Sequence, residues 1–340
     1  MAFKVWQALK KGDVVDVVAP GFRSTDAEVE AGVKFLEQWG LRPRLPKDLF
    51  GDDILSSNAD LKRLRHLETA LTSKSSRAIW CLRGGYGSIR LIPGLLKLKR
   101  PSMVKPLLGI SDVTTLQLFL EMKWQWPSLQ APLLDRLGRV IDPSVAMGRP
   151  IPIREQIDEL KQVVFGETEE VRHTGLTQLG KASQVKSLLS KKSKSGVVEG
   201  TVTGGNLLTF ASANGTSIHP TTDGKILYFE DVGERGYRVD RWLVQLVQVG
   251  IISKKTKAIV FGDFIEGDEK NGKSLVPGVI ARFAETLAFE MGIPVFTGLK
   301  SGHGVDQRIV PLCTAARLNL REGELLISTG VETQTKGRRT

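Results

Sequence analysis

Cysteine and histidine are scarce in this chain of 340 residues, and both shortages exclude kinds of site. The two cysteines, Cys81 and Cys313, lie in apolar stretches, so we expect buried thiols rather than a disulfide framework. Ligands for a metal are lacking, and we predict no metal and no cofactor. No apolar run reaches the roughly 18–20 residues of a membrane span, and the N-terminus has no apolar signal core. We therefore expect a cytoplasmic protein without a membrane span.

Positive charge is abundant. The formal net charge is +11 and the isoelectric point is near 9.6, with lysines concentrated in 181–194 and basic residues in 336–340. This balance favours acidic partners, which include nucleic acid, anionic surfaces and polycarboxylate substrates. Because the chain has neither an aromatic-rich single-strand-binding motif nor a Cys/His finger, we predict no nucleic-acid partner.

The first part of the chain alternates between two kinds of pattern. Short apolar runs at 11–20 and 77–82 predict buried strands, and the spacing of apolar residues over 26–39 and 61–71 predicts helices. Residues 105–120 add another strand followed by a helix. This alternation is typical of a parallel sheet covered by helices on both faces.

The pattern weakens in the middle of the chain and changes after it. We predict an N-terminal α/β domain with a parallel sheet over residues 1–145, a linker or insert over 146–198, and a strand-rich α+β domain over 199–340. The linker contains an amphipathic piece and the lysine-rich stretch. In the last domain, Gly204-Gly205-Asn206 is expected to begin a loop that leads into a helix at about 207–213. The predicted fold class is therefore α/β with two domains.

The stretch 105–120, KPLLGISDVTTLQLFL, places Ser111 and Asp112 at the turn between strand and helix. A hydroxyl at such a turn stands clear of both elements, beside helical N–H groups that have no partner. Ser111 is therefore a candidate nucleophile. A simple helix N-cap is the commoner use of a lone serine at this position.

A glycine-rich loop, Arg83–Gly87, follows the strand at 77–82. Its spacing fits neither a dinucleotide fingerprint nor a phosphate-binding loop. In parallel sheets, ligands bind at the carboxyl ends of the strands, where this loop, Pro20-Gly21 and Ser111 are all expected. Glycines let main-chain N–H groups approach an oxyanion closely, although a merely flexible turn has the same composition.

A carboxylate and a histidine complete the candidate set. Glu230 ends the predicted strand at 225–229, so the sheet would hold it more firmly than Glu234 in the next loop. The same charge-rich turn also fits a solvated surface. His303 lies in a glycine-flanked loop after a strand, where an imidazole can meet a substrate. A nucleophile, a base and an orienting carboxylate are the parts of a catalytic triad.

The other three histidines are not candidates for the site. We expect His66, in a basic helix, and His173, in the linker, to be exposed to solvent. His219 precedes Pro220 and is expected to be structural.

Five motifs occur in order along nearly the whole chain. They are Arg83-Gly84-Gly85-Tyr86-Gly87, Gly109-Ile110-Ser111-Asp112, Gly204-Gly205-Asn206-Leu207, Glu230-Asp231 with Tyr237-Arg238-Val239-Asp240-Arg241, and Gly302-His303. In combination they resemble the LD-carboxypeptidases, muramoyltetrapeptide carboxypeptidases of the serine peptidase family that also holds the microcin C self-immunity hydrolases.

The resemblance implies a Ser–His–Glu hydrolase that removes the terminal D-alanine from the peptidoglycan stem tetrapeptide. Ser111 would be the nucleophile, His303 the general base and Glu230 the residue that orients His303. The implied partner is a peptidoglycan-derived tetrapeptide, free or linked to a muropeptide.

Further implications concern the rest of the site and the assembly. The oxyanion hole would consist of the main-chain N–H groups of Gly85 and Asp112, and Tyr86 and Asn206 would contact substrate. The family has two domains with the site in the crevice between them, and its members are usually homodimers. Both features are therefore expected here.

The chain also departs from the family pattern. Gln130-Ala131-Pro132 replaces a frequent Gly-Pro after the strand that follows the nucleophile helix, and the segment 143–198 is long and basic. No motif separates stem peptides from the peptidyl-nucleotide substrates of the immunity branch. A hydrolase of that branch, and a binding protein that holds peptidoglycan fragments without turnover, remain the alternatives.

Overall fold

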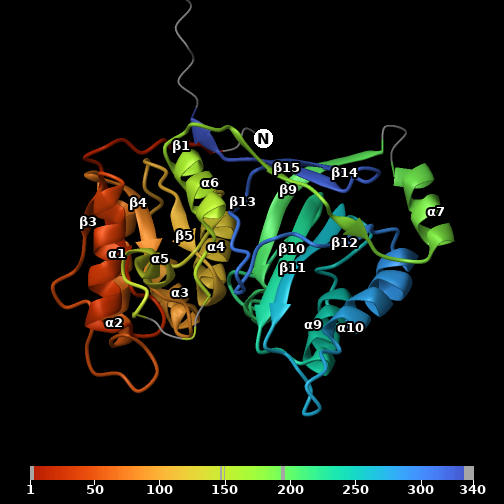
Figure 1. The fold of residues 1–340 in the computed structure, drawn as a ribbon, viewed down its shortest axis with the longest axis horizontal. Helices are drawn as coiled ribbons and strands as arrows, with labels where there is room; N and C mark the ends of the chain where they lie inside the picture. The colour runs from red at the N-terminus through yellow and green to blue at the C-terminus, as the bar shows by residue number, and fades with distance from the viewer. Residues whose placement is uncertain (1–3, 146–147, 149, 193–195, 333–340) are drawn as a thin grey trace, which may run out of the picture.

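The computed structural model describes residues 4–145, 148, 150–192 and 196–332. The chain forms two halves side by side, each built on its own sheet, with the N-terminal half in red to yellow and the C-terminal half mainly in green to blue (Figure 1). The expected α/β architecture, with a parallel-sheet N-terminal part and a strand-rich C-terminal part, is confirmed.

The N-terminal half has a six-stranded sheet in the order β13-β6-β5-β4-β2-β3, in which only β13 is antiparallel to its neighbour. Its strands are β2 (Val14–Val18), β3 (Arg42–Arg44), β4 (Ser76–Cys81), β5 (Leu107–Gly109), β6 (Ser128–Gln130) and β13 (Val310–Leu312). The helical segments are α1 (Asp26–Gln38), α2 (Asp60–Thr72), η1 (Ser88–Leu91), α3 (Ile92–Leu95), η2 (Ser111–Val113), α4 (Thr114–Phe119), η3 (Leu120–Trp124) and α5 (Leu134–Ile141).

The C-terminal half has an eight-stranded sheet in the order β7-β15-β14-β9-β10-β11-β12-β8, with a parallel centre from β9 to β12. Its strands are β7 (Glu170–His173), β8 (Thr177–Gln178), β9 (Val197–Asn206), β10 (Lys225–Val232), β11 (Ala258–Ile265), β12 (Val295–Thr297), β14 (Ala315–Asn319) and β15 (Glu324–Ser328). Its helical segments are α8 (Leu207–Ser212), α9 (Gly236–Gln248), α10 (Val276–Phe283) and η4 (Ala284–Ala288). A short pair, β1 (Trp6–Gln7) with β16 (Val331–Glu332), joins segments near the two ends of the chain.

The middle segment 146–198, predicted as a linker or insert, contributes elements to both halves. Helix α6 (Arg154–Val164) packs its apolar face into the N-terminal core, whereas β7 and β8 pair with strands of the C-terminal sheet. Helix α7 (Ala182–Lys192) contains most of the basic stretch and lies at the far end of the C-terminal half (Figure 1). The last residues of that stretch and the basic residues 336–340 lie outside the described residues. The predicted domain boundaries themselves stay a prediction.

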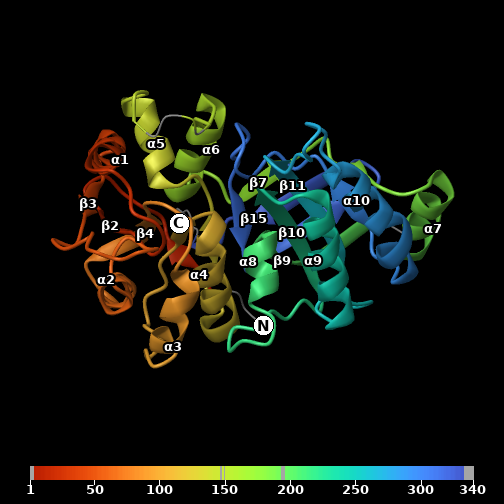
Figure 2. The same ribbon diagram turned by 90° about the horizontal axis from the view of Figure 1, so that it is seen from below.

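One apolar core connects the two halves. It contains buried side chains of α2, α3 and α4 from one half and of α8, α9 and α10 from the other. Helices α4 and α8 lie side by side at the junction (Figure 2). Because the helix that follows Ser111 is part of this junction, the packing of the halves also fixes the candidate site.

Polar contacts reinforce the junction. The Glu121 carboxylate in η3 receives hydrogen bonds from Lys225 Nζ (2.6 Å) and Thr203 Oγ1 (2.5 Å) of the C-terminal sheet. In the same way Gln130 Nε2 donates to the Tyr228 hydroxyl at 2.9 Å. Buried and partly buried hydrogen bonds of this kind, some of them charged, restrict how the two surfaces can pack.

Some expectations are wrong in detail. Gly204–Asn206 are the end of β9 rather than a loop, and β10 continues two residues beyond Glu230. His173 is 1% exposed, in β7, and burial lowers its pKa to about 3. The His66 side chain is only 10% exposed and its Nε2 lies 2.9 Å from Asp48 Oδ1. Among the described residues, no helix combines the length and apolarity that crossing a bilayer requires.

Candidate active site

Ser111 is the first residue of the helical segment η2, at a strained turn that follows β5. Its φ is +69°, a left-handed value that non-glycine residues seldom adopt and that recurs at functional sites. Such strain is known from nucleophile elbows, where a sharp strand-to-helix turn exposes a serine hydroxyl. The N-cap of η2 is Ile110 and that of α4 is Val113, so the alternative of Ser111 as a helix N-cap is not what the chain adopts. Ser111 is half-buried, whereas the residues after it are buried.

The glycine loop packs directly against this serine. A Cβ on Gly84 would lie 2.7 Å from Ser111 Cβ and 3.0 Å from its Oγ, so only glycine fits there without a shift. Gly85 follows with a φ of +100°, a conformation that glycine adopts without strain. Among the described residues, its N–H donates to no protein acceptor. Gly85 is therefore the residue after the glycine that packs on Ser111, and its role as an oxyanion donor stays a prediction.

Asp112, the other expected oxyanion donor, uses its side chain to hold the same loop. Its Oδ2 accepts a hydrogen bond from the N–H of Ser88 at 2.8 Å. Burial raises the pKa of this carboxyl, although the Ser88 hydrogen bonds oppose the rise. The contact therefore fixes the end of the glycine loop relative to the residue after Ser111.

Glu230 and His303 form a buried pair. His303 Nδ1 lies 2.6 Å from Glu230 Oε2, and the two residues are 5% and 0% exposed. This contact orients the imidazole and leaves Nε2 as the nitrogen that can face a nucleophile. Arg136 in α5 donates from Nη1 to the main-chain oxygen of His303 at 3.1 Å, so the N-terminal half also supports the histidine loop.

The strands of the C-terminal sheet bring this pair to the nucleophile helix. Glu230 lies opposite Asn206 in the pairing of β10 with β9, and the N–H of Asn206 donates to Thr114 Oγ1 at 3.0 Å. Thr114 is three residues after Ser111, so parts of the chain that are over 90 residues apart in sequence meet here. No hydrogen bond joins Ser111 to His303 in the described part of the chain. Catalytic contacts of this kind are often long before substrate binds.

The two predicted substrate-binding residues differ in their surroundings. Tyr86 is 41% exposed on the glycine loop and is open to a ligand. Asn206 is buried and its side chain is already engaged, because its Oδ1 accepts from the N–H of Thr209 and its Nδ2 donates to Asp231 at 2.8 Å. These contacts give Asn206 a helix-capping role, and contact with substrate stays a prediction for both residues.

Sequence reasoning assigned no role to two carboxyl groups close to the pair. Burial, with Glu230 nearby, raises the pKa of Asp231 to about 7. Burial, with Asp306 and Glu230 nearby, likewise raises the pKa of Asp263 to about 7. A Cβ on Gly304 would meet Asp263 Oδ2 at 2.9 Å, so this carboxyl lies against the His303 loop. The sequence held a signal for Asp263, since it comes shortly after the apolar run KAIVF at 257–261, much as Glu230 comes directly after the apolar run ILYF at 226–229.

The side chains and amides of the site suit acyl transfer. The described residues contain no group of three or more His, Cys, Asp or Glu side chains that could hold a metal ion. A strained serine, glycine-loop amides and a carboxylate-oriented histidine can together attack a carbonyl and stabilise the oxyanion that results.

Comparisons with known proteins find similar proteins over most of the chain. Residues 15–131 match the family model of the LD-carboxypeptidase N-terminal domain, and residues 199–318 match that of the C-terminal domain. A putative carboxypeptidase of Rickettsia conorii is 34% identical over 247 residues, which cover 73% of this chain and 69% of that protein. The murein tetrapeptide carboxypeptidase of Pseudomonas aeruginosa is 29% identical over 303 residues, covering 87% and 90% of the two chains.

Solved structures give the same result for the fold. The muramoyltetrapeptide carboxypeptidase from Oxalobacter formigenes superposes with a TM-score of 0.73 at 25% identity, over 93% of this chain and 98% of the other. The microcin C7 self immunity protein MccF has a TM-score of 0.77 at 19% identity, over 95% and 98%. At that identity the second likeness concerns the fold alone.

Proposed function

The chain belongs to the LD-carboxypeptidase family, and we propose that it removes the C-terminal D-alanine from peptidoglycan stem tetrapeptides through an acyl-enzyme on Ser111. The relatives named as murein and muramoyl tetrapeptide carboxypeptidases support this substrate. The observation that carries the mechanism is the buried contact of 2.6 Å between His303 Nδ1 and Glu230 Oε2.

In the proposed reaction, Ser111 Oγ attacks the scissile carbonyl while His303 Nε2 takes the hydroxyl proton. The main-chain N–H groups of Gly85 and Asp112 stabilise the oxyanion, and one such donor lowers the barrier by about 3–4 kcal/mol. His303 then gives the proton to the leaving nitrogen of D-alanine. Water then attacks the acyl-enzyme while His303 takes its proton. The acyl group leaves Ser111 Oγ, which receives that proton from His303.

Glu230 acts through His303. Its carboxylate keeps the Nδ1 proton in place, so Nε2 is the unprotonated nitrogen, and it stabilises the imidazolium that forms during attack. The excess positive charge of the chain, +11, favours the approach of a peptide with several carboxylates. Tyr86 and Asn206 are proposed as further contacts to that peptide. A cytoplasmic location and a homodimer are also part of the proposal, and light scattering of the purified protein tests the dimer.

The test uses defined tetrapeptide stems that end in D-alanine or in L-alanine, with product masses followed over time. We expect release of D-alanine only, and none from Ser111→Ala. Activity that survives in Ser111→Ala contradicts the proposed nucleophile. If no stem is cleaved, a peptidyl-nucleotide panel distinguishes the immunity branch from a binding protein, since only the former yields products.

A further inference from the structure

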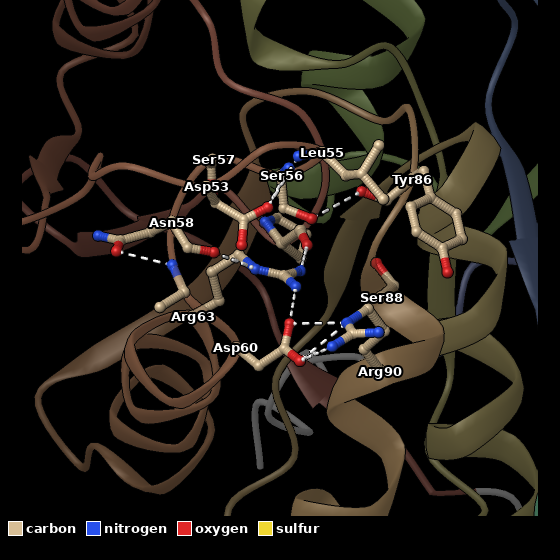
Figure 3. Close-up of polar contacts among 12 residues, drawn as sticks. Asp53, Leu55, Ser56, Ser57, Asn58, Asp60, Arg63, Tyr86, Ser88 and Arg90 are labelled. Carbon is tan, nitrogen blue, oxygen red and sulfur yellow. Dashed lines mark hydrogen bonds and ion pairs between the residues drawn. The ribbon is translucent and has the colours of Figure 1, made fainter.

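Arg63 is a fully buried cation near the carboxyl end of β2, in the half of the chain that contains the candidate nucleophile. It lies in the first turn of α2, is 2% exposed, and donates through three different nitrogens (Figure 3). Nε donates to the main-chain oxygen of Asn58 at 2.8 Å, Nη1 to that of Pro20, and Nη2 to the Asp60 carboxylate. Because its side chain is shielded from solvent, it cannot touch a substrate.

The two main-chain acceptors belong to separate loops, and Arg63 also borders a third loop. Pro20 follows β2 and Asn58 precedes α2, while a Cβ on Gly87 of the glycine loop would lie only 2.6 Å from Arg63 Nη1. The Asp60 carboxylate is shared with Arg90, which follows the glycine loop in η1 (Figure 3). One guanidinium thus donates to two of these loops and lies against the third.

The loops in turn press against the nucleophile. The N–H of Phe22 donates to the main-chain oxygen of Gly84 at 2.8 Å, and a Cβ on Gly21 would meet that oxygen at 2.3 Å. Gly84 packs on Ser111. The contacts therefore run without a gap from Arg63, through Pro20 and Gly21, to the serine and to the loop that contains Gly85.

Charge provides a second connection. Arg63 favours the ionised form of Asp112, whose Oδ2 holds the N–H of Ser88. Lysine could not replace this arrangement, because its ammonium is a single point on a flexible stem whereas guanidinium holds several acceptors in one fixed plane.

We infer that Arg63 is a positioning residue, which holds the glycine loop in the place from which the Gly85 amide stabilises the oxyanion. The inference rests on the proposed function, because it assigns the support of that oxyanion hole. Arg63 acts through the loops and not on the substrate.

The test measures the rate at which a fluorophosphonate labels Ser111, together with kcat and KM for the tetrapeptide. The variants are Arg63→Lys, Arg63→Met and Asp60→Asn. Fluorophosphonates phosphonylate an activated serine and lose fluoride whatever peptide the enzyme prefers. Labelling therefore reports on the oxyanion hole independently of the substrate.

Lys105→Met is the matched control, since Lys105 is also a buried cation that stabilises α2. Its Nζ donates to the main-chain oxygens of Ala70 and Ser73 at the opposite end of that helix, away from the glycine loop. Urea unfolding of every variant shows how much stability each has lost.

We expect Arg63→Met to lower kcat and the labelling rate about 100-fold, the effect of losing one oxyanion donor, with KM within about threefold. Arg63→Lys and Asp60→Asn should show smaller losses of the same kind, which keeps the test open if Arg63→Met does not fold. Lys105→Met should lose stability and keep the labelling rate.

Two results would overturn the inference alone. One is wild-type labelling in folded Arg63 variants, and the other is a loss of rate in Lys105→Met as large as in Arg63→Lys at equal stability. If neither the wild-type protein nor Ser111→Ala is labelled by the fluorophosphonate, the proposed function itself fails.

Discussion

A single methyl group at Gly84 should disable the nucleophile while leaving the chain folded. Gly84 does not have a positive φ, so its backbone accepts alanine. The added Cβ would lie 2.7 Å from Ser111 Cβ, 3.0 Å from its Oγ and 3.3 Å from the Ile110 main-chain oxygen. The effect of Gly84→Ala is therefore steric and directed at the serine.

The magnitude follows from these distances. Carbon atoms in contact prefer about 3.5–4.0 Å, so Ser111 and the glycine loop must separate by about 1 Å. A misplacement of that size costs about 100-fold in rate. Crowding of this kind lowers the free energy of unfolding by about 1–3 kcal/mol, which a chain of 340 residues should tolerate.

Gly278→Ala is the matched control because a Cβ there has no neighbour within 4 Å. It lies in α10, where replacing glycine should raise the free energy of unfolding by about 0.5–1 kcal/mol and leave activity unchanged. Tetrapeptide kinetics and urea unfolding are measured for both variants. The steric reasoning is refuted if Gly84→Ala keeps kcat within about threefold of wild type.

Three further predictions concern the buried charges. Glu230→Gln should reduce kcat by about 10³–10⁴-fold with little change in KM, because His303 loses its orienting carboxylate, and a near-normal kcat at pH 7 would contradict the triad. Glu121→Gln should lower the free energy of unfolding, measured with urea, by about 3 kcal/mol, because Lys225 loses its anionic partner. The double variant Glu121→Leu with Lys225→Met should recover most of that loss. Burial raises the pKa of Asp231 to about 7, so between about pH 4 and pH 7 the folded chain keeps a proton that the unfolded chain has lost. The free energy of unfolding should therefore fall on the order of 3 kcal/mol as the pH rises through this range. Asp231→Asn should flatten that slope, and an equal slope in the variant would assign it to other groups.

Local pattern was enough to predict most elements of the fold. The apolar runs and helical spacing predicted β2, α1, α2, β4 and the unit from β5 to α4, all within a few residues of the observed bounds. These elements are amphipathic or fully apolar, so the spacing of their apolar residues along the chain indicates which faces are buried. Gly204–Asn206 misled the prediction because glycines normally mark loops, yet β9 continues through them where the close approach of Thr114 leaves no space for a Cβ on Gly205.

The histidines show where local pattern fails. The sequence around His173 is polar and resembles a linker, but β7 pairs with β15 and buries the ring. Burial of this kind depends on a strand more than 150 residues further along the chain, which no local window includes. The basic stretch 181–194 had no predicted structure either, and its described part forms α7.

By itself the sequence determined the types of element, the glycines around the nucleophile turn and the three candidate residues, because each depends on side chains close together along the chain. The tertiary structure alone decided the contact between His303 and Glu230, the raised pKa values of Asp231 and Asp263, and the burial of Arg63 beneath three loops. Distance, burial and electric field are properties of groups that meet in space, and the residues that meet here are brought together only when the two sheets pack on one core.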